Sequence, residues 1–590
     1  MAFPPDNNGA LPLDLPTSGQ GFAQIRKNNF LYVDKTEYIY HLARKPGAYF
    51  LSRPRRFGKS LLVNSLHELF QGERELFQDL WIDASDYHFE KFPTVSLTMV
   101  IDCDTEEMTK NSLYKLIKKV AGRHGFTDTE GMTPGEILEN LIENLAEKNE
   151  KGVAVLIDEY DYPINNVLDN MEVAQKNLKT LHDFYVKLKN LTLTGKIHCL
   201  FITGVTKISH VSLFSAFNNL MDLTLHPEYA NICGFTEREF DKYFGDYQDR
   251  LLSRFNEEKI FPSIKTKENL KAAILKWYDG YSFNGKNKIL NPYSIINFFS
   301  LNNFSNFWFR SGTTTFLVKN ILNNPFDYAI AETQKTTPDE LLNLTLTKIK
   351  PIPLLFQTGY LTLGKRNDDG SYFLRLPNDE VAESFTVFLR DFISDELYPS
   401  IASLRAEISG ALLNCDSKSL EKAFQEIFTW VPRQLLLSFE KNYHGLLFVA
   451  LKTMGFDVAA EVPEQKGDLD LLIIVKWPPM AFIIELKHHK LEKEREDGDG
   501  KNKVSGKGAV GRKTSKTAAA KIAATKKKLL ERGLILAKTQ IEEKHYADRY
   551  LYDFPTIKKV AASIVGKGDI AVEIYDKFEP ARKGADSANL

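Results

Sequence analysis

The sequence predicts an α/β protein, with a parallel β-sheet flanked by helices in its first half and a smaller α/β sheet near its end. Two observations support this. From about residue 21, short apolar runs alternate with helical patterns, as in the βαβ units that build parallel sheets. From residue 468, two apolar strand-like runs precede a polar insertion, a helical pattern and two final runs. A length of 590 residues suggests about three or four domains.

Composition narrows the class of protein. Hydrophobic residues make up 43% of the chain and charged residues 26%, which is typical of globular proteins. The net charge of -1 means that any nucleic-acid surface must come from local patches. The four cysteines form no CxxC pair, which favours buried thiols over disulfides or zinc. The N-terminus lacks the features of a secretion signal, and no apolar stretch reaches about 18 residues, so we expect a cytoplasmic protein without a membrane span.

Alternating apolar runs define the elements of the first half. A lead rich in Pro, Gly and Asn, which we expect to be flexible, covers residues 1–20. Each later apolar run is short enough for a strand, and each helical pattern is long enough to cross the sheet. The expected strands are 48–52, 94–102, 152–160 and 196–205, and the expected helices are 60–70 and 172–189.

A helical region and a hairpin are expected next. Helical patterns begin near Cys233, where Thr236 and Glu239 have the spacing of a capping box. A turn-rich segment interrupts them at 277–294. Residues 340–385 combine a helical pattern with two strand-like runs around an Asn-Asp-Asp-Gly turn. Because helices followed by a hairpin suit a winged helix, we expect that module here.

The segment SRPRRFGKSLL (52–62) carries the first chemical motif. It ends in Gly58, Lys59 and Ser60, the last part of the P-loop pattern GxxxxGK[ST], although Arg53 stands at the first glycine. A strand precedes the motif and a helix follows it, so the N–H groups of the helix start can bind a phosphate. Lys59 would reach the outer phosphates and Ser60 would bind Mg²⁺.

An acidic pair ends the expected strand at 152–160. In VAVLIDEYDYP, Asp158 and Glu159 follow an apolar run, at the edge where open α/β sheets bind ligands. Asp158 would hold Mg²⁺ and Glu159 would orient the attacking water, as phosphoryl transfer requires. The alternative is that both acids cap a surface turn.

Further groups near this site have open alternatives. Thr203 ends the apolar strand of FITGVTKIS, where it could contact the γ-phosphate or serve only as a strand-end turn residue. Arg53, Arg55 and Arg56 crowd the phosphate loop, where they could bind phosphate or lie on a solvated face.

A second set of charged residues lies near the C-terminus. Asp470 starts one strand, and Glu485 and Lys487 lie on the next in AFIIELKHHK. Because side chains alternate along a strand, Glu485 and Lys487 point to the same face. The carboxylates of Asp470 and Glu485 could hold Mg²⁺, and Lys487 could orient or activate a water for attack on a phosphodiester. The alternative is an ordinary surface salt bridge between Glu485 and Lys487.

The strand is followed by histidines and a basic tract. His488 and His489 could join a metal site, but histidines just past a strand are more often exposed. Residues 501–528 contain ten Lys or Arg and no acid. Such a tract can grip phosphates, and more often it is a solvated loop.

Several motifs occur in an order that resembles the AAA-ATPase-like family, whose members commonly carry a C-terminal domain of the PD-(D/E)xK nuclease superfamily. The resemblance covers about residues 15–580. It implies that Lys59, Ser60, Asp158 and Glu159 take the roles given above, and the Arg53 departure fits that family. The motifs are SRPRRFGKSLL, YVDKTEYI, LIDEYDYPI, FITGVTKIS, LFSAFNNL, CGFTEREF, WYDGYSF, NPYSI and QTGYLTL.

The nuclease-superfamily resemblance rests on the order of KGDLDLLI and FIIELK. It implies that Asp470, Glu485 and Lys487 form the D…ExK triad. It also implies supporting roles for Glu461 on the preceding strand and for Gln540 and Tyr546 in QIEEKHYADRY. Two departures stand out. Asp468 replaces an Arg that the family usually has, and the basic tract separates the triad from its following helix.

The sequence therefore predicts a P-loop, AAA-like parallel sheet with a helical lid and a winged-helix module, followed by a restriction-endonuclease-like α/β/α domain. The implied function is an ATPase that uses ATP and Mg²⁺, coupled to a metal-dependent nuclease acting on DNA or RNA. The alternative is an ATP switch or scaffold whose C-terminal domain binds without cleaving; a motor on nucleic acid has less support, and homo-oligomerisation stays open. The expected regions are the lead 1–20, core 21–232, lid 233–335, winged helix 336–385, helical connector 386–435 and nuclease-like domain 436–580 with a basic insertion at 490–528.

Overall fold

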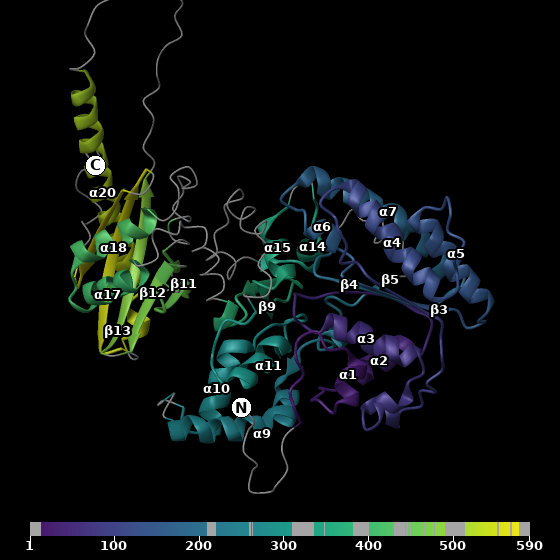
Figure 1. The fold of residues 1–590 in the computed structure, drawn as a ribbon. Coiled ribbons are helices and arrows are strands. Elements are labelled where there is room, and N and C mark those ends of the chain that lie inside the picture. Colours follow the sequence, from purple (N-terminus) through teal and green to yellow (C-terminus); the bar gives the residue numbers. More distant parts are fainter. Residues whose placement is uncertain are drawn as a thin grey trace, which may run out of the picture. The chain divides into compact units, whose positions relative to one another are not determined.

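A computed structural model of the chain divides into two compact units (Figure 1). The first unit comprises Met1–Asn324 and Gln334–Phe385, and the second comprises Pro325–Thr333 and Thr386–Leu590. The described residues are 13–208, 220–258, 261, 264–308, 335–346, 349–381, 400–429, 443, 447–448, 450–451, 454–464, 467–476, 478–489, 514–551, 554–566 and 569–577. The first part of the lead, most of the LFSAFNNL motif and residues 490–513 of the basic insertion lie outside them.

The first unit is built on a five-stranded parallel sheet in the order β2-β3-β4-β1-β5. Every residue of β3 is buried, which fits a parallel sheet covered on both faces. The four expected strands are confirmed, whereas β5 is too short to stand out as an apolar run. The strands are β1 (Gly47–Ser52), β2 (Thr94–Thr98), β3 (Val153–Asp158), β4 (Ile197–Gly204) and β5 (Leu220–Asp222).

Helices cover both faces of this sheet, with α1, α2 and α3 on one side and α4, α5 and α7 on the other (Figure 1). Their starts follow local sequence signals: Thr133 and Glu136 form a complete capping box at α5, and Thr105 caps α4. The helices are α1 (Phe22–Lys27), α2 (Thr36–Ala43), α3 (Lys59–Phe70), α4 (Glu106–Arg123), α5 (Pro134–Glu147), α6 (Tyr162–Asn165) and α7 (Met171–Leu193). Short 3₁₀ turns span Arg74–Phe77, Trp81–Ala84 and Pro227–Tyr229.

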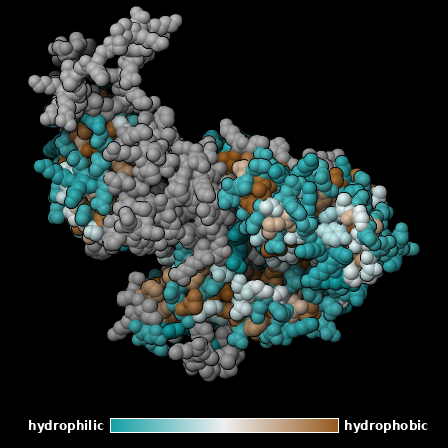
Figure 2. All heavy atoms as spheres, turned by 45° about the horizontal axis from the view of Figure 1, so that its top comes forward, coloured by the Kyte–Doolittle hydropathy of each residue, from teal (hydrophilic) through white to brown (hydrophobic). Residues whose placement is uncertain are grey.

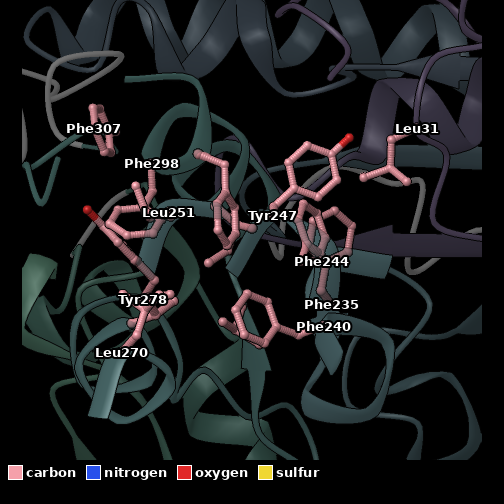
Figure 3. Packing of buried hydrophobic residues seen from close by; sticks show 14 of the residues in the cluster. Leu31, Phe235, Phe240, Phe244, Tyr247, Leu251, Leu270, Tyr278, Phe298 and Phe307 are labelled. Carbon is pink, nitrogen blue, oxygen red and sulfur yellow. The ribbon is translucent and has the colours of Figure 1, made fainter. Parts of the chain in front are cut away.

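The expected lid is helical and has an aromatic core (Figure 3). Thr236 and Glu239 form the expected capping box, with the Thr236 N–H donating to Glu239 Oε2 at 2.7 Å and the Glu239 N–H to Thr236 Oγ1 at 3.2 Å. Phe244 and Phe299 stack with ring centroids 5.4 Å apart. The lid comprises α9 (Glu237–Glu258), α10 (Lys267–Tyr278), α11 (Pro292–Leu301) and the paired strands β6 (Phe235–Thr236) and β7 (Ile289–Leu290).

A small module follows within the first unit. Its sheet has the order β8-β10-β9, and the expected hairpin around the Asn-Asp-Asp-Gly turn is confirmed. The winged helix expected at residues 336–385 stays a prediction. The elements are β8 (Lys335–Thr336), α14 (Pro338–Leu342), α15 (Pro351–Thr358), β9 (Thr362–Arg366) and β10 (Tyr372–Arg375).

The second unit contains a mixed five-stranded sheet in the order β11-β12-β13-β14-β15. β13 and β14 are parallel and the other pairs are antiparallel. The expected strands are confirmed, and so is the expected helix before the last two strands, which ends at Lys544. The elements are β11 (Asp457–Glu464), β12 (Gly467–Lys476), β13 (Pro479–His489), α20 (Thr514–Lys544), a 3₁₀ turn (Asp548–Tyr550), β14 (Thr556–Val565) and β15 (Asp569–Tyr575).

The region expected as a helical connector contains α17 (Ser400–Leu413) and α18 (Ser417–Thr429). Side chains at every fourth position of α18 accept hydrogen bonds from backbone N–H groups of the edge strand β15, so this region is part of the second unit rather than a linker. The bonds run from Ile574 N–H to Ser417 Oγ (2.9 Å), from Val572 N–H to Glu421 Oε2 (3.1 Å) and from Ile570 N–H to Gln425 Oε1 (3.3 Å).

Hydrophilic residues cover most of the described surface on the face drawn in Figure 2. Among the large apolar side chains that remain exposed, Leu193 and Leu301 are isolated in the sequence, whereas Ile535 and Leu536 are neighbours. Among the helices that the structure describes, none has the length and apolar character needed to cross a membrane.

Candidate functional site

The phosphate loop lies between β1 and α3, as the sequence predicts. Gly58 has a φ of 90°, which a glycine adopts without strain, and Lys59 begins α3 directly after it. Lys59 is buried, and its Nζ donates to the carbonyl oxygens of Arg53 and Pro54 at 2.9 Å each. Because burial disfavours the charged amine, the pKa of Lys59 lies below its usual value. The ammonium therefore lies inside the loop, at the start of the helix.

Arg53, which replaces the first glycine of the motif, is a structural residue. It is 1% exposed, so neither the solvated face nor direct phosphate binding describes its place. Its guanidinium donates to the carbonyls of Thr224 (2.6 Å) and Tyr229 (3.1 Å) and lies 3.9 Å from the centre of the Phe283 ring. Burial lowers its pKa to about 10. Arg53 thus ties the phosphate loop to the segment that leads into the lid.

The other two arginines have different surroundings. Arg55 is half-buried. Burial raises the pKa of Glu159 and the charge of Arg55 opposes that rise, so Arg55 lies near the acidic pair. Arg56 is exposed, has a φ of 69°, and lies 4.8 Å from the Tyr293 ring of the lid. Arg55 is therefore the better placed of the two to meet a phosphate.

Asp158 and Glu159 form one electrostatic group with Lys59. Asp158 ends β3 and is 5% exposed, while Glu159 follows with a φ of 53°, which is uncommon outside glycine. Burial raises the pKa of both carboxyl groups, and the positive charge of Lys59 opposes the rise. A hydrogen bond from the Ser60 side chain also lowers the pKa of Asp158. The burial of Asp158 does not fit the interpretation that the two acids merely cap a surface turn, and Glu159 beside it is half-buried.

Thr203 lies on β4, between the strands that carry the phosphate loop and the acids. It is fully buried, and its hydroxyl donates to the Leu51 carbonyl at 2.7 Å. The hydroxyl is therefore engaged inside the sheet, which gives no support to a direct contact with the γ-phosphate.

Asp161 is a functional candidate that the sequence reasoning missed. This buried carboxylate accepts from the Val205 N–H (3.1 Å), the Thr206 N–H (2.6 Å) and the Thr206 hydroxyl (2.7 Å). It thereby joins the turn that carries Glu159 to the end of β4. The sequence signal that could have identified Asp161 is its place as the third acid of the D-E-Y-D motif, because an Asp after a strand often anchors a turn.

A mainly apolar pocket opens beside the phosphate loop. One wall comes from α3 and the N-terminal segment, and the other from the lid, which gives YVDKTEYI, CGFTEREF and NPYSI a place in the site. The sequence analysis assigned no residues to such a pocket. Its lining includes Leu31, Val33, Gly58, Leu61, Leu62, Cys233, Phe235, Pro292 and Ile296.

A partly buried ion pair supports this pocket. Lys35, which lines it, donates to Glu239 at 2.6 Å and to the Asn231 carbonyl at 2.9 Å. Burial lowers the pKa of Lys35, and the charge of Glu239 opposes that change. The pair connects the N-terminal segment to the first helix of the lid, so the two walls of the pocket are fixed relative to each other.

These features fit a nucleotide with Mg²⁺. A cationic loop at a helix start suits phosphates, and a buried carboxylate beside Ser60 offers the oxygen ligands that Mg²⁺ prefers. An apolar pocket next to the loop suits a planar base. The arrangement can therefore bind a nucleoside triphosphate and place Glu159 near its phosphates.

The second candidate site lies on the sheet of the second unit. Asp470 precedes Leu471, which pairs with Ile484, so Asp470 stands opposite Glu485. Its Oδ2 accepts from the Leu486 N–H at 2.7 Å. Glu485 is fully buried, and the Nζ of Lys487 donates to its Oε1 at 2.8 Å. The burial of Glu485 does not fit the alternative of an ordinary surface salt bridge.

Supporting residues of the second site are partly described. Gln540 donates to the Tyr546 hydroxyl at 3.3 Å, and the pKa of Tyr546 is raised by burial and by the nearby carboxylates of Glu485 and Asp470. Both therefore lie near the triad. The side chain of Glu461 lies outside the described residues. Within the described part of the chain, no group of three or more His, Cys, Asp or Glu could hold a metal. Asp470 and Glu485 are the two carboxylates that the structure brings together at this site.

The two histidines after the triad are half-buried rather than exposed. His488 stacks on Tyr443 with ring centroids 5.3 Å apart, and its Nε2 lies 2.9 Å from the Gly566 carbonyl. Because neighbours on a strand face opposite sides, His488 and the triad residue Lys487 point away from each other.

Comparisons with known proteins match two regions of the chain. Residues 16–214 match a family described as "Predicted AAA-ATPase", and residues 438–573 match the PD-(D/E)XK nuclease superfamily. The family resemblance expected from the motifs is thereby confirmed.

One relative and one solved structure complete the comparison. The chain is 30% identical over 491 residues to an uncharacterized protein from the vnfD 5′ region of Azotobacter chroococcum mcd 1, covering 80% of this chain and 90% of that one. A STAND ATPase with a tetratricopeptide repeat sensor from Pyrococcus horikoshii is 11% identical, with a TM-score of 0.21, 72% coverage of this chain and 58% of that chain, less than two thirds of its length. Such a low score carries no argument.

Proposed function

Because the chain belongs to the family of predicted AAA-ATPases that carry a PD-(D/E)XK nuclease-superfamily domain, we propose that it hydrolyses ATP and couples this to cleavage of nucleic acid. The observation that carries the first part is the convergence of Lys59, Asp158 and Glu159 at the carboxyl edge of one parallel sheet, beside an apolar pocket. The second part rests on the buried Glu485 with its partner Lys487.

In the ATP site, each group has a distinct task. The helix start after Gly58 and the Lys59 ammonium bind the phosphates, and the pocket beside Leu61 accepts the base. Ser60 and Asp158 would hold Mg²⁺, which offsets phosphate charge when it is bound. Glu159 orients the attacking water. The raised pKa of Glu159 favours this role, because a carboxylate whose pKa lies closer to neutral pH accepts a proton from water more readily.

In the nuclease-like site, Asp470 and Glu485 would hold a divalent cation, which would stabilise charge on a phosphodiester. Lys487 orients a water molecule or donates to the phosphate. Its Nζ lies 2.8 Å from Glu485 Oε1, so all three side chains of the triad share one region. This arrangement favours cleavage over the alternative, in which ATP drives a switch or scaffold whose C-terminal domain only binds nucleic acid or a protein.

The test is cleavage of single- and double-stranded DNA and RNA with Mg²⁺, with and without ATP, alongside phosphate release from ATP. Wild type, Lys59→Ala and Glu485→Gln are compared. Cleavage by wild type but not by Glu485→Gln supports the nuclease, and the Lys59→Ala protein reports whether ATP gates it. ATP hydrolysis without cleavage of any of the four substrates would favour the switch, and no hydrolysis would reject the ATPase.

A further inference from the structure

The turn that carries Glu159 is held by its two following residues. The Tyr160 hydroxyl donates to the Thr206 carbonyl at 2.8 Å and lies 3.3 Å from the Ile208 N–H. Asp161 accepts from the N–H groups of Val205 and Thr206. Both neighbours of Glu159 on its C-terminal side are thus bound to the segment that leaves β4, which we call the exit segment (residues 205–208).

Little space is left around this anchor. A Cβ atom on Gly204 would lie 2.3 Å from Asp161 Oδ1 and 2.6 Å from Tyr160 Cδ1. Glu159 itself has a φ of 53°, a conformation that costs free energy and persists only where the surrounding contacts impose it. The position of the exit segment therefore determines the position of the Glu159 backbone.

The exit segment is in turn held by the small module. The buried side chain of Gln357, on α15, accepts from the Lys207 N–H at 2.7 Å and donates to the Leu341 carbonyl at 2.6 Å. Next to it, Ile208 forms a parallel bridge with Leu344. One amide side chain thus connects α14 of the module to the exit segment.

The same part of the module also touches the phosphate loop. Gly359 ends α15 with a φ of 95°, and a Cβ atom there would lie 2.7 Å from Pro54 Cβ. Pro54 supplies one of the two carbonyls that accept from Lys59. The QTGYL motif therefore contacts both the phosphate loop and the support of the acidic turn.

We propose that Gln357 is a positioning residue for ATP hydrolysis: through the exit segment it holds the turn of Glu159, so the small module sets the hydrolysis rate. The proposal rests on the proposed ATPase function and adds a residue that lies outside the phosphate loop and the acidic turn. Gln357 acts through Lys207, Thr206 and Asp161, and it has no part in binding the nucleotide.

The test measures kcat, KM and ATP affinity of Gln357→Met, which keeps the length of the side chain and removes both hydrogen bonds. We expect kcat to fall about tenfold or more, with the Kd for ATP within about twofold of wild type, because only the turn of Glu159 is released. Thr362→Val is the matched control. Thr362 lies in the same module and makes two buried hydrogen bonds to the Ser282 backbone, and its loss should lower thermal stability similarly without changing kcat.

A second variant interrupts the same connection from the core side. Thr206→Val removes the hydroxyl that lies 2.7 Å from Asp161 Oδ2. We expect the effects of Gln357→Met and Thr206→Val on kcat to be less than additive in a double-mutant cycle, because both break one chain of contacts. A kcat of Gln357→Met within twofold of wild type, an equal loss in Thr362→Val, or full additivity would overturn the proposal. Absence of ATP hydrolysis in wild type would instead reject the proposed function itself.

Discussion

The Nζ of Lys487 lies 2.8 Å from Oε1 of Glu485, a carboxylate with no exposed surface. An ion pair buried in this way recovers little net stability, because desolvation of the charges offsets their attraction. A pair of this kind on an otherwise apolar strand is more easily explained by chemistry than by folding.

We therefore expect Glu485→Gln and Lys487→Met each to reduce cleavage of nucleic acid by at least about a hundredfold, since each removes a group that touches the substrate or the metal. The fold should persist, as judged by circular dichroism. Glu573→Gln is the control, because Glu573 pairs with Ala561, which pairs with Glu485 on its other side, and so lies on the same face two strands away. Equal activity of all four proteins would contradict the nuclease interpretation.

Lys59→Met should weaken ATP binding by more than about tenfold, because the loop loses the cation that meets the outer phosphates. Calorimetric titration with a non-hydrolysable ATP analogue and Mg²⁺ measures the affinity. Arg56→Met serves for comparison, since the exposed Arg56 packs on Tyr293. A Lys59→Met protein that binds like wild type would place the nucleotide elsewhere.

The base pocket predicts a different pattern. Ile296→Trp should lower the affinity for ATP and leave that for inorganic tripolyphosphate unchanged, because Ile296 lines the pocket and not the phosphate loop. Leu301→Trp, at an exposed position on the same helix, should change neither affinity. If Ile296→Trp lowered the affinities for ATP and for tripolyphosphate equally, the pocket would not hold the base.

Glu159→Gln should raise the stability of the nucleotide-free protein at pH 7. Burial raises the pKa of Glu159 above its ordinary value of 4.5. At pH values between 4.5 and the raised pKa of the folded state, the folded protein binds more protons than the unfolded protein, so stability falls as pH increases. A neutral amide at position 159 does not ionise, so the variant does not lose this stability at pH values above the folded pKa of Glu159. Denaturant midpoints of both proteins from pH 4 to 8 test this, and the difference should disappear near the acid end. A gain that is independent of pH would exclude the ionisation as its cause.

Gly204→Ala should destabilise the protein by about 1–3 kcal/mol, because the added methyl group overlaps Asp161 and Tyr160. Gly122→Ala is the matched control. Gly122 lies within α4 with no atom near the added Cβ, so this change should instead stabilise by about 0.5–1 kcal/mol. Chemical denaturation gives both values, and a neutral Gly204→Ala would show that the acidic turn tolerates movement.

Local sequence patterns were sufficient for most elements and for the charged groups of both sites. The strand before Gly58, the strand before Asp158 and the capping box at Thr236 are encoded by neighbours in the chain. These groups have recognisable spacing because a sheet edge or a helix start needs particular residues there.

Contacts across long separations could not be read in this way. The burial of Arg53 depends on carbonyls more than 170 residues away, at Thr224 and Tyr229. The apolar pocket beside the phosphate loop likewise forms only when the N-terminal segment, α3 and the lid come together. The role of Asp161 was hidden for the same reason, since its donors, Val205 and Thr206, lie on another strand's exit.

The hydrogen bonds from β15 to α18 have a consequence for assembly. The unpaired N–H groups of an edge strand can hydrogen-bond to a strand of another chain. In β15, three of these N–H groups donate instead to the side chains of Ser417, Glu421 and Gln425 on α18. While α18 stays in place, β15 cannot template aggregation or accept a foreign strand. The helix α18 thus protects the sheet edge from pairing with another chain, which charged residues or prolines on the edge strand do in other sheets.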